Sequence, residues 1–260
     1  MVLFPAQVSA AILEIPGTGA CEVLLREVAA AYNARYPGQQ VVVPPTVGSS
    51  GGIRLVASNQ AVLARVAQPL NDKEKALGLQ YLVFARDMVI FAGGAKVTVK
   101  NLTQTQLVDA YRGKISKWQD LGGAPGPIRL LVRQPRDSSL LVIREHLPVF
   151  KDIVFPPGAK VIHTDPKMLA MLQKYKYSLG WLTFSALKGA HSPIHPLALD
   201  GIAPTPENAR SGKYQLLGDY ALVFKEDRLN DLARSFLDFV FSQDGAQLLE
   251  QYGVIPVAKE

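Results

Sequence analysis

Cysteine is nearly missing from this sequence, because Cys21 is the only one in 260 residues. An intramolecular disulfide is therefore impossible, and a C-x-x-C redox or zinc motif is excluded. A dense tract of lysine and arginine is also missing, although the formal net charge is +6. The chain can attract small anions, but it lacks the basic tract typical of nucleic-acid binders, and no nucleic-acid partner is expected.

The sequence also lacks long apolar runs and common cofactor motifs. No stretch approaches the ~20 apolar residues of a membrane-spanning helix. The segment PGTGA (16–20) lacks the third glycine of a dinucleotide-binding fingerprint, and no G-x-x-x-x-G-K-[S/T] sequence is present. His191 and His195 have i, i+4 spacing, but Pro193 and Pro196 argue against a helix that would align their rings. Neither a cofactor nor a metal site is expected.

The first ten residues, MVLFPAQVSA, suggest a processing site. Val8-Ser9-Ala10 has the small-x-small pattern that precedes a signal-peptidase cut, after a short apolar piece without a basic start. We interpret Met1–Ala10 as the tail of a truncated secretion signal, with maturation before Ala11. An ordinary N-terminal arm is the alternative.

The chain repeats one order of elements: strand, small or polar loop, helix. Hydrophobic residues make up 48% of the sequence, enough for one large α/β domain or two lobes. The apolar run 11–15 predicts a buried strand, followed by a glycine turn and a helix that Pro37-Gly38 stops. The run 39–46, the loop 47–52 and a short helix from 53 repeat this order. The third copy is the strand 127–132, the polar loop VRQPRDSSL (132–140) and a helix.

Other segments extend the same pattern. Residues 81–93 read as one long strand passing between lobes, and Thr103 with Gln106 forms a capping box before a helix that Gly113 ends. A helix is expected at 165–175, a strand within 178–187, and two helices in 229–257, divided near Asp244-Gly245. Strands alternating with helices predict a mostly parallel sheet in each lobe, with loops at the strand C-termini facing a ligand crevice.

The three small or polar loops are candidate anion sites. A helix N-terminus carries unpaired N–H groups and about half a positive charge, so a loop there can hold an oxyanion by its backbone. In VRQPRDSSL, arginines that can fork onto oxyanions flank the loop. Ordinary helix capping is the alternative for each loop taken alone.

A serine hydrolase is a rival interpretation. Gly48-Ser49-Ser50-Gly51-Gly52 fits G-x-S-x-G, the nucleophile elbow of α/β-hydrolases, with Ser50 as the nucleophile. Pro44-Pro45 lies just upstream, however, and cannot sit in the central strand that such an elbow terminates. The hydrolase is therefore the less favoured alternative. Its candidate histidines are His146, His163, His191 and His195.

Longer segments are specific enough to compare with known families. They are VGSSGGI (47–53), PLNDKE (69–74), NLTQTQLVDAYRGKISKWQDLGG (101–123), SLGWLTFSALKG (178–189), LDGIAPTPENARSGKYQL (199–216) and FLDFVFSQDGAQLLEQYGVIPV (236–257). Taken in order, they resemble the periplasmic phosphate-binding proteins of ABC importers, from about Ile12 to Val257. The resemblance implies an α/β, two-lobed periplasmic binding fold of type II, with a ligand cleft between lobes that close on a hinge. It places 1–85 and 215–260 in lobe I and 86–214 in lobe II.

The resemblance also implies a function. The chain is expected to be a non-enzymatic, monomeric solute-binding protein that captures phosphate or a related small oxyanion for an ABC importer. It would act in the periplasm, or outside the cell at the envelope, with a membrane permease or a sensor protein as its partner. The alternative is the same fold with an altered or lost pocket, used as a sensory or docking module.

The family's ligand positions fall on the three loops. The first loop retains one hydroxyl, and the second is intact. The third loop, VRQPRDSSL, corresponds to the fourth ligand-binding element of the family, which reads arginine, two variable residues and then G-S-G-T. Here Arg133 matches the arginine and Ser139 matches the threonine. The implied ligand-binding residues are Thr18, Gly19, Ala20, Ser49, Ser50, Gly51, Arg133, Asp137, Ser138 and Ser139.

The chain departs from the family at several of these positions. Ala67 stands where phosphate binders have an aspartate that accepts the ligand's own proton, and alanine cannot do this. Arg136 and Ser138 replace glycines, so the loop is expected to follow a different path. Asp137 replaces the serine. It either supplies the acceptor that Ala67 lacks, or caps its own helix and repels a dianion.

Overall fold

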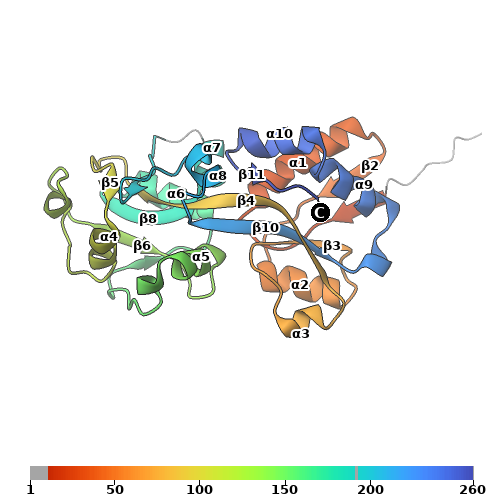
Figure 1. The fold of residues 1–260 in the computed structure, drawn as a ribbon, viewed down its shortest axis with the longest axis horizontal. Coiled ribbons are helices and arrows are strands. Elements are labelled where there is room, and N and C mark those ends of the chain that lie inside the picture. Colours follow the sequence, from red (N-terminus) through yellow and green to blue (C-terminus); the bar gives the residue numbers. More distant parts are fainter. Residues whose placement is uncertain (1–10, 191–192, 260) are drawn as a thin grey trace, which may run out of the picture. The chain divides into compact units, whose positions relative to one another are not determined.

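The computed structural model describes residues 11–190 and 193–259. The signal-remnant hypothesis for Met1–Ala10 lies outside these residues, as does His191. The chain divides into two compact units (Figure 1). Unit 1 runs to Leu82 and takes in Leu222–Leu248 and Lys259, and unit 2 comprises Val83–Ala221 and Leu249–Ala258.

Unit 1 begins with the predicted order of strand, loop and helix, twice over. β1 and β2 pair in parallel, and β3 is hydrogen-bonded to β10. Three elements run from one unit into the other: β4 (Gln80–Gly93), β10 (Leu217–Phe224) and α10 (Gln243–Gln251). The other α-helices and strands of unit 1 are β1 (Ala11–Glu14), α1 (Glu22–Arg35), β2 (Gln39–Val42), α2 (Ser49–Ala57), β3 (Leu63–Val66), α3 (Asp72–Lys75) and α9 (Asp231–Val240).

The core of unit 1 explains the helical spacing of α1. Its buried residues recur every three or four positions, and Tyr32 among them packs edge-to-face on Phe236 and Phe239 of α9. The Tyr32 hydroxyl donates to Ser235 Oγ at 2.8 Å, so the buried phenol is satisfied. This contact fixes α1, and with it the loop that precedes α1.

Unit 2 is built on a mixed sheet. β8 (Ser178–Thr183) runs parallel to β6 (Arg129–Val132) but antiparallel to β4, and β7 (Lys160–Val161) pairs in parallel with β6. The remaining α-helices and strands of unit 2 are β5 (Asn101–Leu102), α4 (Gln104–Tyr111), α5 (Ser138–His146), α6 (Asp165–Lys174), α7 (Phe184–Gly189), β9 (Ala198–Leu199), α8 (Pro206–Arg210) and β11 (Ile255–Pro256).

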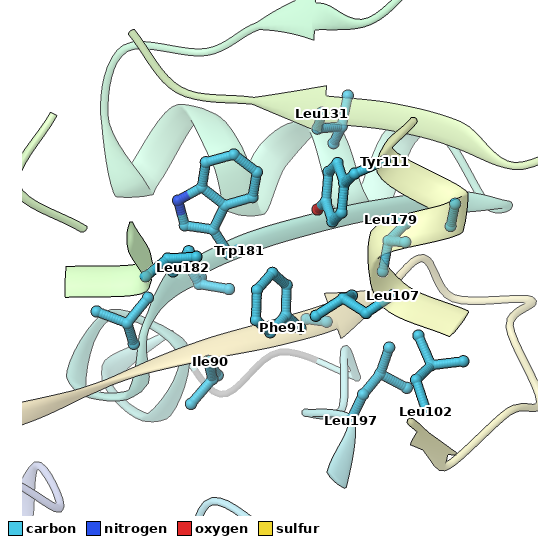
Figure 2. Close-up of a cluster of buried hydrophobic side chains, with 14 of the residues drawn as sticks. Ile90, Phe91, Leu102, Leu107, Tyr111, Leu131, Leu179, Trp181, Leu182 and Leu197 are labelled. Atoms are coloured by element: carbon cyan, nitrogen blue, oxygen red, sulfur yellow. The ribbon is translucent and has the colours of Figure 1, made fainter. Parts of the chain in front are cut away.

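The core of unit 2 gathers aromatic rings around β8. Trp181 and Tyr111 pack with ring centroids 5.4 Å apart, and Phe91 of β4 lies 6.0–6.2 Å from both (Figure 2). All three side chains are buried, and large buried aromatics dominate the stability of such a core. The packing holds the ends of β6 and β8, from which the polar residues of the site project.

Several predicted boundaries shift. α2 begins at Ser49, so Ser49, Ser50 and Gly51 form its first turn instead of a preceding loop. The tail helices divide at residues 241–242, not at Asp244-Gly245. Gly245 lies inside α10, where a Cβ would come within 2.3 Å of the Phe239 carbonyl oxygen, so this glycine permits a tight junction between helices. β10 was not among the predicted strands, whereas 81–93 is the single strand predicted there.

Candidate functional site

The first candidate loop joins β1 to α1. The Thr18 side chain is buried, and its Oγ1 accepts from the Ala20 N–H at 3.3 Å. The Thr18 hydroxyl hydrogen has no partner among the described residues, so it is free to donate to a ligand. Gly17 makes the turn possible, since its φ is +144° and a Cβ would lie 1.9 Å from the Arg65 carbonyl oxygen.

The second candidate loop leads into α2. Ser49 is buried, and its Oγ accepts from the Ala67 N–H at 3.1 Å, which leaves its hydrogen free within the described chain. No acidic side chain lies in the first turn of α2, so the partial positive charge of this helix end is not neutralised there. Ser50 is exposed, and its Oγ lies 3.5 Å from Gln68 Nε2.

The two loops of unit 1 pack against each other. A Cβ on Gly52 would lie 2.9 Å from Gly17 Cα, and one on Gly19 would touch the Thr46 side chain at 3.4 Å. The Thr46 hydroxyl also donates to the Gly17 carbonyl at 3.0 Å. The structure therefore brings together the unit 1 residues that the sequence singled out: Thr18, Gly19, Ala20, Ser49, Ser50 and Gly51. Ala67 touches this cluster through its N–H and offers no acceptor side chain.

Arg65 is the residue of unit 1 that sequence reasoning missed. It is fully buried on β3, and its guanidinium donates to the carbonyls of Thr18 (2.8 Å), Pro44 (2.8 Å) and Ile15. Its charge is met by Glu22 at 3.3 Å. Burial lowers the pKa of Arg65, and Glu22 opposes this. Arg65 thus ties β1, β2 and the first loop together, and the only sequence signal was one arginine inside the apolar run VLARVA.

In unit 2, Arg133 follows β6 and is already paired. Its Nε and Nη2 donate to Asp137 Oδ2 at 2.9 and 2.7 Å, and its Nη1 donates to Asp165 Oδ1 at 3.0 Å. Burial acts to lower the pKa of Arg133, but the charges of Asp165 and Asp137 outweigh it, and the net shift is upward. A cation bound to two carboxylates is not a free charge partner for a ligand.

Asp137 caps its own helix, as one of the two interpretations of this residue expected. Its Oδ1 accepts from the N–H of Ser139 at 3.0 Å and of Leu140 at 3.4 Å, and also from the Ser139 hydroxyl. Ser139 Oγ in turn accepts from Trp181 Nε1 at 3.0 Å. The carboxylate of Asp137 thereby receives guanidinium, hydroxyl and helix N-terminal N–H donors, which is the donor set an oxyanion would use.

The substituted glycine positions do not strain this loop. Neither Arg136 nor Ser138 has a positive φ, since Asn59 and Asp200 are the non-glycine residues of the described chain that do. Arg136 is exposed and makes no ion pair with the described residues, and Ser138 is the first residue of α5. The loop at 136–138 therefore has no need of glycine.

A buried polar network continues from Arg133 and was not foreseen from the sequence. Asp165 accepts from the Thr183 hydroxyl at 2.8 Å, and Thr183 Oγ1 lies 3.4 Å from Ser185 Oγ. Ser185 donates to Asp87, which also accepts from the Tyr220 hydroxyl at 2.9 Å. The network places two buried carboxylates, Asp165 and Asp87, in unit 2 with one buried arginine.

Asp87 makes the stability of unit 2 depend on pH. Burial raises the pKa of Asp87 to about 7, the hydrogen bonds from Ser185 and Tyr220 oppose the rise, and Asp165 adds to it. The folded chain therefore binds the carboxyl proton of Asp87 more tightly than the unfolded chain does. The contribution of Asp87 to stability is complete below about pH 4 and is lost as the pH rises toward 7.

Replacing Asp87 with asparagine should remove much of this slope. At pH 8 the buried Asp87 carboxylate is ionised, and asparagine removes this buried charge. We therefore expect the unfolding free energy of Asp87→Asn to be about 1–2 kcal/mol higher than that of the original chain. The gain is limited because the amide brings two N–H donors into a site where the carboxylate only accepted hydrogen bonds. Urea unfolding followed by the fluorescence of Trp118 and Trp181, both in unit 2, measures this at pH 5 and pH 8. Asp152→Asn, at an exposed position of unit 2, is the control, and equal pH slopes in Asp87→Asn and the original chain would contradict the assignment.

The serine hydrolase interpretation gains no support from the geometry. Ser50 lies within the first turn of α2, and β2 ends at Val42, so there is no direct strand-to-helix elbow. The described histidines, His146, His163 and His195, belong to unit 2, whereas Ser50 belongs to unit 1. Ser50 has Gln68 as its side-chain neighbour rather than a base.

Neither a metal centre nor a membrane helix emerges from the part of the chain that the structure describes. Residues 11–190 and 193–259 contain no group of three histidine, cysteine or acidic side chains placed to hold a metal ion. Within the same ranges, none of the helices combines the length and apolarity needed to cross a membrane. Cys21 is a buried cysteine.

Comparison with known proteins gives a consistent group of relatives. The chain is 23% identical over 252 residues to the phosphate-binding protein PstS of Borreliella burgdorferi, which covers 95% of this chain and 90% of that protein. It is 23% identical to PstS of Bacillus subtilis, covering 94% of this chain and 80% of the relative.

Solved structures of the same group share the fold. A protein from Clostridium perfringens, described as a phosphate ABC transporter substrate-binding protein with bound phosphate, superposes with a TM-score of 0.84 at 23% identity, over 95% of this chain and 100% of that one. An ABC-type phosphate transport receptor from Vibrio cholerae gives 0.72 at 22% identity, over 94% and 99%. The expected α/β fold of the type II periplasmic binding proteins is confirmed.

The family assignment follows from a match along most of the sequence. Residues 5–244 match the family described as the PBP superfamily domain. This family consists of solute-binding proteins and is not an enzyme family. The resemblance inferred from the sequence segments is confirmed at the level of the family, and the chain belongs to the PBP superfamily.

Proposed function

We propose that this chain is an extracytoplasmic solute-binding protein that captures phosphate, or a related small oxyanion, for an ABC importer. It acts without catalysis, as a monomer, in the periplasm or at the cell envelope, with a membrane permease as its partner and no role for nucleic acid. The PstS proteins of Borreliella burgdorferi and Bacillus subtilis, to which the chain is similar over nearly its whole length, are named as phosphate-binding proteins.

The observation that carries the proposal is the set of hydrogen-bond donors around the Asp137 carboxylate. A carboxylate of the chain itself sits on the Arg133 fork, the Ser139 hydroxyl and the N-terminus of α5. We infer that this loop binds oxyanions by these donors, and that a ligand oxyanion competes with Asp137 for them. Arg133 and Ser139 are the proposed donors of this loop to the ligand, and Asp137 and Ser138 are proposed to lie next to the bound ligand.

The loops of unit 1 support the same function by a different means. Thr18 and Ser49 are buried hydroxyls with free hydrogens, each close to a helix N-terminus that offers backbone N–H groups. We propose that Thr18 and Ser49 donate through their hydroxyls, and that Gly19, Ala20, Ser50 and Gly51 donate through their backbones. Hydrogen bonds to a charged group contribute about 1.5–3 kcal/mol each.

One observation favours the second candidate, a sensory or docking module without a ligand. Arg133 is already paired with the carboxylates of Asp137 and Asp165, and Ala67 cannot accept the proton of a protonated oxyanion. Micromolar affinity requires about 8 kcal/mol net, so the loss of a few donors is enough to abolish binding. In this case no anion would stabilise the chain.

Ser49→Ala tests the proposal through unit 1. We expect this variant to weaken phosphate binding about tenfold, because one hydrogen bond to a charged ligand is lost. Isothermal titration calorimetry with phosphate, sulfate and molybdate measures the affinity and its selectivity. A ligand at a hundred times its dissociation constant should also stabilise the folded chain by about 2.7 kcal/mol.

Ser58→Ala is the matched control for Ser49→Ala. Ser58 lies at the other end of α2, where its exposed hydroxyl donates to the Arg54 carbonyl at 2.8 Å. It should bind phosphate like the original chain. Equal affinities of Ser49→Ala and Ser58→Ala would remove Ser49 from the proposed site, and no binding of any anion by the original chain would favour the docking module.

A further inference from the structure

Three cationic side chains gather around one tyrosine of unit 2. The Arg129 guanidinium lies 4.2 Å from the centre of the Tyr175 ring, and the ammonium groups of Lys160 and Lys174 lie 5.4 and 5.7 Å from it. The ring attracts each cation by its quadrupole, but the three positive charges repel one another. A hydrogen bond from Lys160, with its charge and that of Lys174, holds the pKa of Tyr175 below its ordinary value.

These cations have no acid to balance them. In the described part of the chain, no aspartate or glutamate forms an ion pair with Arg129, Lys160 or Lys174. Other cations of unit 2 are paired, among them Lys114 with Asp109 and Arg210 with Glu250. The positive potential around Tyr175 is therefore uncompensated and would favour an anion.

An apolar hollow adjoins the cations. A cavity of about 650 Å³ is lined by Arg129, Lys160 and Tyr175 together with the apolar side chains of Ile115, Ile128 and Pro156. Close in sequence to these lining residues, Val161 is 47% exposed and Val154 is 85% exposed. We call the cavity and the three cations around Tyr175 the cationic groove.

The groove lies along a sheet edge. β7 carries Lys160 and Val161 and is the last strand in the order of its sheet, paired with β6 on one side. Both residues of β7 are exposed, and in the described chain no strand other than β6 pairs with β7. An open edge offers unpaired backbone groups to an added strand.

We propose that the cationic groove binds an extended segment of a partner protein in which acidic and apolar side chains alternate. Such a segment places carboxylates on the three cations, apolar side chains in the hollow and backbone groups on the edge of β7, since alternate side chains of a strand point to opposite faces. A small anion meets only the cations, which are too exposed to hold it strongly once salt screens them. The site is separate from the loops proposed to bind phosphate.

The test uses the full chain and a defined peptide. A fluorescein-labelled peptide of alternating glutamate and valine, about twelve residues long so that it spans more than β7, is titrated by fluorescence anisotropy in phosphate-free buffer. We expect saturable binding, weakened at least about tenfold by Arg129→Gln with Lys160→Gln. The matched control, Lys114→Gln with Arg210→Gln, removes the same charge from the same unit and should bind like the original chain.

Peptide chemistry separates the apolar contribution from the acidic one. Alternating glutamate and serine should bind more weakly, because the apolar contacts are lost, and alternating lysine and valine should not bind. No binding of the glutamate–valine peptide, or equal weakening by both double variants, overturns the proposal. So does preferential binding of vesicles of anionic phospholipid that is lost in the Arg129→Gln, Lys160→Gln variant, since the groove would then recognise a membrane surface.

Discussion

Asp137→Ser is expected to raise the affinity for phosphate by about 30–100-fold, on the order of 2–3 kcal/mol. In the original chain, Asp137 occupies two of the donors on Arg133 and the hydroxyl of Ser139. Serine removes that competing carboxylate and its repulsion toward a dianion. It also remains a good N-cap, so α5 should keep its start. Calorimetry with phosphate, read against the original chain, measures the gain.

Asp165 is the reason that Arg133 should stay in place in this variant. Its Oδ1 holds Arg133 Nη1 at 3.0 Å, and its other oxygen is fixed by Thr183. Nε and Nη2 of Arg133 then form a free fork that matches two oxygens of an oxyanion. An affinity that is unchanged or lower in Asp137→Ser would mean that Arg133 is not a ligand residue.

Asn230→Ser is the matched control for Asp137→Ser. Asn230 caps α9 of unit 1 by accepting from the Ala233 N–H at 2.9 Å, so the exchange also puts serine at a helix N-cap, far in sequence from Arg133. Its phosphate affinity should equal that of the original chain. If the original chain binds no anion and Asp137→Ser does, the loop is a phosphate site that this sequence has closed, which would favour the docking module.

The loops could be predicted from the sequence because their signals are local. Glycine-rich turns, a capping box at Thr103 and Gln106 and the spacing of apolar residues in α1 depend on neighbours within one or two turns, and the structure has them as predicted. Ser49 was expected in the loop before α2, whereas it is the first residue of that helix. The sequence thus indicated where anion-binding groups could lie.

The partners of those groups could not be predicted, because they come from distant parts of the chain. Arg133 meets Asp165 across 32 residues, and Asp87 meets Tyr220 across 133. Nothing in VRQPRDSSL shows that Arg133 has a second carboxylate partner, since this depends on how α6 packs beside β8. Likewise Arg65 looked like an interruption of an apolar run, and its role depends on three carbonyls 21–50 positions away.

Arg65→Met is expected to lower the unfolding free energy of unit 1 by about 3–5 kcal/mol. Methionine fills most of the volume but donates no hydrogen bond, so the buried carbonyls of Ile15, Thr18 and Pro44 lose the guanidinium as their donor. Glu22 keeps Arg26 at 2.8 Å and is not stranded. The cost therefore falls on the backbone that shapes the first loop. Arg65→Lys should be intermediate, because an ammonium keeps the charge but not the planar fork.

Hydrogen exchange at the amides of α1 and α2 is the measurement, since Trp118 and Trp181 lie in unit 2 and their fluorescence does not report on unit 1. Arg54→Met, an exposed arginine on α2, is the matched control and should cost less than about 0.5 kcal/mol. Equal protection in Arg65→Met and Arg54→Met would mean that the carbonyls find other donors. If Arg65 does brace the loop, Arg65→Met should also weaken phosphate binding without touching a ligand residue, since the loop that carries Thr18 would no longer be held in position.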